Sequence, residues 1–151
     1  MGNRAVITDT EGKIGVYLHW NGGRDSVEAF LKYCELQGFR SPKDDPHYAF
    51  ARLAQVICNF FDGWLSCGIG LKNELDCDNF DNGVYIIDGW NIVGREFFEG
   101  EEQNSHDLLG MLEAIDAQQP TNMQLGKGKI REVLNGKEKS AISDIQRAIN
   151  R

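Results

Sequence analysis

The sequence predicts an α+β fold in which antiparallel β-hairpins pack with two central helices, followed by a helical C-terminal extension. Runs of β-branched and aromatic residues occur in pairs separated by turn residues, which is typical of hairpins. Helical apolar spacing lies between these pairs, without the strand–helix–strand alternation of a doubly wound sheet. We expect residues 1–120 to form an α+β core domain and residues 121–151 a basic helical C-terminal extension.

The first hairpin and the first helix are expected within the first forty residues. Residues 5–8 and 14–18 are apolar runs separated by a polar turn, which indicates two paired strands. Asp25 is the expected N-cap of the helix that follows, and Glu28 completes a capping-box pattern. Apolar residues then recur at helical spacing until Gly38, where we expect the helix to end.

The second helix is expected to begin at Asp45, with Pro46 at its first helical position and Gly63 at its end. Residues 64–71 alternate loosely around glycines and indicate a strand.

The remaining elements follow the same signals. Residues 84–87 and 91–93 flank a turn and predict the second hairpin. A third helix is expected after residues 104–105 and before Pro120. The extension should carry a short helix around Ile130 and a last helix, whose narrow apolar stripe consists of Ile142, Ile145 and Ile149.

Charge is unevenly distributed along the chain. The net charge is −7, but residues 73–120 carry −11 and residues 121–151 carry +4. A globally acidic chain is a poor candidate for direct nucleic-acid binding. The opposite charges, with the exposed stripe on the last helix, predict that the extension packs on the acidic face of its own or a neighbouring subunit. We therefore expect a homo-oligomer.

Composition points to an ordinary globular protein, with 41% hydrophobic and 26% charged residues. No run of about 18 apolar residues and no signal-peptide pattern is present, so we expect no membrane association and a cytoplasmic location. In a reducing cytoplasm the four cysteines are expected to be thiols rather than disulfides or zinc ligands.

Residues 17–26 form the most informative stretch, with a His, a Trp, an Asn and an Arg beside two glycines. The glycines allow a sharp bend, and the helix that follows directs unpaired N–H groups toward it, which favours anions. Trp20, Asn21 and Arg24 together suit a nucleotide-like ligand. Asp25 would oppose a phosphate there, and the structural alternative is that Trp20 belongs to the core and Arg24 is a solvated charge.

No motif for catalysis or metal binding is present. The acidic run 76–83 departs from a calcium-binding loop at three positions, so a turn held by local Asp and Asn contacts is favoured. Residues 126–129 lack the spacing of a phosphate-binding loop, and no nucleophile elbow or His-Glu-x-x-His occurs. We expect no catalytic residue, no metal and no cofactor, although a dispersed catalytic cluster remains open.

The candidate ligand-binding residues share planar groups, near turns or on helix faces, that can stack on a base or bind a phosphate. They are Trp20, Asn21, Arg24, Arg52, Tyr85, Trp90, Asn91 and Arg95. Trp90 at a hairpin turn either faces a base or a partner subunit, or fills the core.

Residues 3–8, 15–28 and 81–85 resemble a family of small proteins from phages and prophages of Gram-positive bacteria, the first type of Thoeris anti-defence protein. The likeness covers roughly residues 3–100. It implies a non-enzymatic sponge, in the cytoplasm of the infected host, that sequesters a cyclic ADP-ribose isomer made by bacterial TIR enzymes. The resemblance also implies an oligomer that holds its small cyclic nucleotide-like ligand where subunits meet.

Two other functions compete with this hypothesis. The acidic segment 73–120 would suit a protein-binding inhibitor that acts as a decoy toward a basic, DNA-handling host enzyme. A nucleotide hydrolase with a dispersed site is the third possibility.

Overall fold

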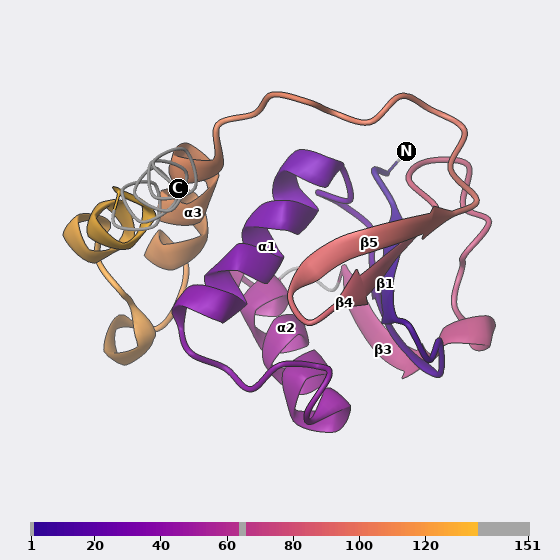
Figure 1. The fold of residues 1–151 in the computed structure, drawn as a ribbon, viewed down its shortest axis with the longest axis horizontal. Helices are drawn as coiled ribbons and strands as arrows, with labels where there is room; N and C mark the ends of the chain where they lie inside the picture. The colour runs from indigo at the N-terminus through magenta and orange to yellow at the C-terminus, as the bar shows by residue number, and fades with distance from the viewer. Residues whose placement is uncertain (1, 64–65, 136–151) are drawn as a thin grey trace, which may run out of the picture.

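A five-stranded mixed sheet, with helices packed against one of its faces, forms the body of the structure (Figure 1). The computed structural model describes residues 2–63 and 66–135. The strands lie in the order β3-β2-β1-β4-β5. They are β1 (Ala5–Asp9), β2 (Ile14–Leu18), β3 (Cys67–Leu71), β4 (Val84–Asp88) and β5 (Asn91–Glu96).

Both predicted hairpins are present, and the α+β class is confirmed. β1 pairs antiparallel with β2, and β4 pairs antiparallel with β5. The two hairpins are joined through a parallel pairing of β1 with β4, which makes the sheet mixed rather than antiparallel throughout. β3 adds to the free edge of β2 and confirms the strand expected in this region, while residues 64–65 lie outside the described residues.

Three α-helices lie where the sequence predicted helices. They are α1 (Arg24–Leu36), α2 (Pro46–Phe60) and α3 (Leu108–Ala117). The start of α2 is as expected, because the Asp45 carboxylate accepts a hydrogen bond from the backbone N–H of Tyr48. Short 3-10 turns occupy Lys72–Glu74 and Thr121–Met123.

The predicted cap of α1 is wrong. Gly23 is the N-cap of α1 and makes no side-chain cap. The Asp25 carboxylate instead accepts from the next residue's N–H, and Glu28 pairs with Arg24, so no capping box forms. α3 begins after residues 104–105, as expected, and its N-cap is Asp107, whose side chain accepts from the N–H of Gly110.

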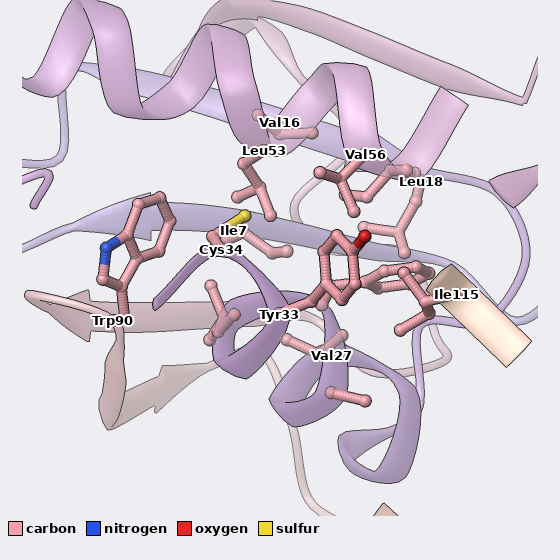
Figure 2. Close-up of a cluster of buried hydrophobic side chains, with 14 of the residues drawn as sticks. Ile7, Val16, Leu18, Val27, Tyr33, Cys34, Leu53, Val56, Trp90 and Ile115 are labelled. Carbon is pink, nitrogen blue, oxygen red and sulfur yellow. The ribbon is translucent and has the colours of Figure 1, made fainter. Parts of the chain in front are cut away.

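The core lies between the sheet and the helices (Figure 2). Figure 2 shows Tyr33 of α1 within this cluster and Trp90 at one edge of it. The Tyr33 hydroxyl donates to the buried Asp116 carboxylate at 2.6 Å. The same carboxylate accepts from the N–H groups of Leu125 and Gly126, and this fixes the chain after α3 to the core.

The first part of the C-terminal extension therefore packs on the core. Residues 127–135 are helical, as predicted around Ile130, whose side chain is fully buried. The predicted last helix, with Ile142, Ile145 and Ile149, lies outside the described residues. Among the helices of the described residues, none has the length and apolarity needed to cross a membrane.

Candidate functional site

Arg24, the first residue of α1, lies at the centre of the candidate site. Its Nε donates to the Glu28 carboxylate at 2.6 Å, and its Nη1 donates to the Glu102 carboxylate at 2.9 Å. The Glu28 contact is an i,i+4 pair on one helix, whereas Glu102 comes from the distant loop between β5 and α3. Arg24 therefore connects the helix start to that loop.

Arg95 of β5 approaches the same carboxylate from the sheet. Its guanidinium lies between the rings of Tyr85 and Phe98, 3.8 Å from each ring centroid, in a double cation–π arrangement. Its Nη1 contacts Glu102, and its Nη2 donates to the Asn82 carbonyl at 2.6 Å. The two stacked rings and the backbone contact hold this guanidinium in one orientation.

The loop 97–107 closes over these groups and passes above the N-terminal end of α1 (Figure 1). The two carboxylate oxygens of Glu102 bind different arginines, Oε1 to Arg95 and Oε2 to Arg24. Gln103 accepts from the N–H of Asp25 at 2.9 Å, and His106 Nε2 lies 2.9 Å from Glu28. Polar contacts rather than secondary structure thus hold the loop.

Two hollows adjoin Arg24. One, of about 280 Å³, lies beneath the loop and is lined by two arginines and three carboxylates, among other residues. The other, of about 320 Å³, lies between α1 and the second hairpin and includes Trp90 and Asn91 in its wall. Arg24 lines both hollows, so a ligand in either hollow would contact the Arg24 side chain.

The structure brings five of the eight predicted site residues together. Arg24, Tyr85 and Arg95 line the hollow beneath the loop, and Trp90 and Asn91 line the other. The Tyr85 hydroxyl donates to the Gly22 carbonyl at 2.7 Å, and burial raises the pKa of this phenol, so it stays protonated. Because Arg95 covers its ring, Tyr85 positions the guanidinium and offers no free face to a base.

Three predicted residues lie elsewhere. Arg52 lies on α2, and its guanidinium lies over the ring of Tyr48 on the same helix and over the ring of Phe39, which precedes the helix. Arg52 lines neither hollow. Trp20 is 44% exposed and packs edge-on against His19. Asn21 has the left-handed φ of 58° that the sharp bend requires, and its amide donates to the Ser26 hydroxyl. The bend is real, but in this structure Trp20 and Asn21 line neither hollow.

Trp90 takes the core position that the sequence left open as an alternative. Its side chain is 8% exposed and belongs to the hydrophobic cluster. The indole Nε1 donates to the Phe39 carbonyl at 3.4 Å. The wall of the hollow is therefore the edge of a packed side chain and not an open stacking platform.

The sequence did not single out Glu102, Phe98 or Glu28 as site residues. Arg24 and Glu28 are four residues apart in a predicted helix, a spacing that favours an ion pair on one helix face. Glu102 gave no such sign, since it is 78 residues from Arg24 and lies in a loop rich in acidic residues.

A third hollow, of about 510 Å³, lies between two loops, and neither Arg24 nor Arg95 lines it. Phe80 and Phe97 line it and are 89% and 54% exposed, and both adopt left-handed backbone conformations. Asp78 and Glu99 lie beside them, which gives this surface both apolar and acidic character.

The acidic run 76–83 is the expected local turn. Asn79, which is buried, accepts from the N–H groups of Asp81 and Gly83. The guanidinium of Arg4 hydrogen-bonds to Asp81 and lowers the pKa of its carboxyl. Within the described residues, no three His, Cys, Asp or Glu side chains cluster closely enough to hold a metal ion.

Comparison of the chain with protein-family profiles, curated proteins and solved structures finds no match.

Proposed function

We propose that this protein is a non-enzymatic sponge that binds a cyclic ADP-ribose-type signal and thereby blocks bacterial TIR-based Thoeris defence. The observation that carries the proposal is the convergence of Arg24 and Arg95 on one bridging carboxylate, where two hollows adjoin. The resemblance of residues 3–8, 15–28 and 81–85 supplies the ligand class.

The arginine pair suits a ligand that carries a diphosphate. Two guanidiniums that already share the two oxygens of one carboxylate can share the oxygens of linked phosphates in the same way. The side chains of Arg24 and Arg95 are 24% and 12% exposed, so a contact there is less screened than one on the open surface. Each adjoining hollow is close to the lower limit of ordinary ligand pockets, roughly 300 Å³.

The surroundings of the arginines favour binding over turnover. Both carboxylate oxygens of Glu28 and of Glu102 already contact an arginine or a histidine, so neither side chain has an oxygen free to accept a proton from a ligand. The Tyr85 hydroxyl donates to a backbone carbonyl, so its proton is already engaged. These contacts support a site that holds its ligand without a proton-transfer step.

Calorimetric titration of cyclic ADP-ribose isomers into the wild type and Arg24→Ala tests the proposal. Loss of one charge-assisted contact should weaken binding about ten- to a hundred-fold. Arg131→Ala is the matched control, because Arg131 of the extension pairs with Glu113 of α3 and lines neither hollow. Equal affinity of the wild type and a folded Arg24→Ala variant would remove Arg24 from the site.

The third hollow favours a second candidate function, a protein-binding inhibitor. Large exposed aromatic side chains beside carboxylates suit a partner surface that is both apolar and basic. A phage-protection assay in bacteria that carry Thoeris separates the two functions. Loss of protection with Phe80→Ser/Phe97→Ser but not with Arg24→Ala supports the inhibitor, and the reverse supports the sponge.

A further inference from the structure

We propose that Glu102 is an internal ligand of the Arg24–Arg95 pair, and that a diphosphate-bearing ligand displaces it and releases the loop 97–107. The inference rests on the proposed function for the location of the ligand site. It adds the chemical group that the site selects and the movement that accompanies binding.

Glu102 blocks the position that an anion bridging the two arginines would need. Its two oxygens are divided between Arg24 and Arg95, so one carboxylate occupies the position between the two guanidiniums. No anion can bridge the same donors while this carboxylate is in place. Ligand binding between the arginines therefore requires that Glu102 leave.

Glu102 can leave its two arginines. Its side chain is 34% exposed, more than that of Arg24 at 24% or Arg95 at 12%, so water can solvate the carboxylate as it moves away. The loop around it contains no helix or strand among residues 97–107. The other anchors are the Phe98 ring on Arg95, the Gln103 contact with the backbone, and the His106 contact with Glu28.

The site should select a diphosphate over a single monovalent anion. A monovalent anion brings no more charge than the carboxylate that it replaces, and it lacks the chain connection that gives Glu102 a high effective concentration. Two linked phosphates bring at least twice the charge and place oxygens at both guanidiniums simultaneously. The Asp25 carboxylate also lines this hollow and repels every anion there, so an anion must engage both arginines to bind.

An internal competitor lowers the apparent affinity of the site, because only the fraction of molecules with the loop released can bind. Replacement of Glu102 should therefore tighten the binding of a diphosphate. A purely structural role for the ion pair gives the opposite expectation, since loss of Glu102 would then only loosen the site.

The test uses inorganic pyrophosphate and inorganic phosphate as probes, titrated calorimetrically at constant ionic strength into the full chain. Glu102→Gln should bind pyrophosphate about tenfold more tightly than the wild type, with a much smaller gain for phosphate. Glu101→Gln is the matched control, because Glu101 lines the same hollow and, in the described part of the chain, makes no ion pair. Glu101→Gln should stay within about twofold of the wild type.

Equal gains for the two variants, weaker binding by Glu102→Gln, or no pyrophosphate binding by any variant would overturn the proposal. Limited proteolysis with a glutamate-specific protease provides the second readout: saturating pyrophosphate should speed cleavage within residues 97–107 of the wild type, which contain Glu99, Glu101 and Glu102. A loop that stays protected at saturation also overturns it. If a cyclic nucleotide binds without release of the loop, the proposed function stands and only the displacement of Glu102 is refuted. If pyrophosphate releases the loop but no cyclic nucleotide binds, the displacement of Glu102 stands and the proposed function is refuted.

Discussion

Trp90→Ala should strongly destabilise the protein. The Trp90 side chain is 92% buried, and a tryptophan removes about 150–250 Å² from water. At about 25 cal/mol per Å² of buried apolar surface this corresponds to about 4–6 kcal/mol, and Trp→Ala changes in cores typically cost about 3–5 kcal/mol. For a chain of 151 residues, each kcal/mol lowers Tm by about 2–4 °C, so a fall of about 6–20 °C is expected.

Urea denaturation followed by circular dichroism measures this change, with Trp20→Ala as the matched control. Trp20 is 44% exposed and lies outside the hydrophobic cluster, so by the same area rate its removal should cost about half as much, about 2–3 kcal/mol or less. If Trp90→Ala and Trp20→Ala were equally stable, within 1 kcal/mol of the wild type, the indole would not be a core residue. That result would instead favour Trp90 as a side chain that stacks on a base of the ligand.

Three further predictions follow from buried or paired groups. Asp116→Ala leaves a tyrosine hydroxyl and two backbone amides without their acceptor, so unfolding in urea should show a loss of about 3 kcal/mol or more. Arg4 lowers the pKa of Asp81, so their pairing stabilises the fold above about pH 4 and is lost as pH falls through the lowered folded-state pKa. Asp81→Asn should accordingly flatten the stability–pH curve below pH 4, and an unchanged acid limb would contradict this. Iodoacetamide should label the exposed Cys58 in the native protein but not the buried Cys34, whose thiol pKa is raised by burial, and mass spectrometry of native and unfolded samples distinguishes the two.

Local signals in the sequence predicted the elements well but not all of their ends. The apolar pairs gave both hairpins, and Asp45 with Pro46 gave the start of α2. The start of α1 failed, because Arg24 draws Glu28 into an ion pair and removes it from the capping box. The parallel pairing of β1 with β4 joins residues almost 80 positions apart, and no local pattern encodes it.

In the candidate site too, the sequence predicts what depends on local signals and not what depends on contacts between distant residues. Arg24 could be found from its position in the turn, since a helix start and a bend are local features. The role of Tyr85 and Arg95 depends on a strand pairing, and Glu102 reaches them through a loop without periodicity. Sequence reasoning therefore named both arginines of the candidate site, together with Arg52, which lies elsewhere, and missed the carboxylate that joins the two.

The most direct test of the central claim is recovery of the bound molecule. The protein is incubated with the product of a bacterial TIR enzyme, separated from free ligand, heat-denatured, and the supernatant is analysed by mass spectrometry. The account predicts release of the intact cyclic ADP-ribose isomer from the wild type and much less from Arg24→Ala. Release of fragments would indicate a hydrolase, and absence of any retained ligand would contradict the sponge.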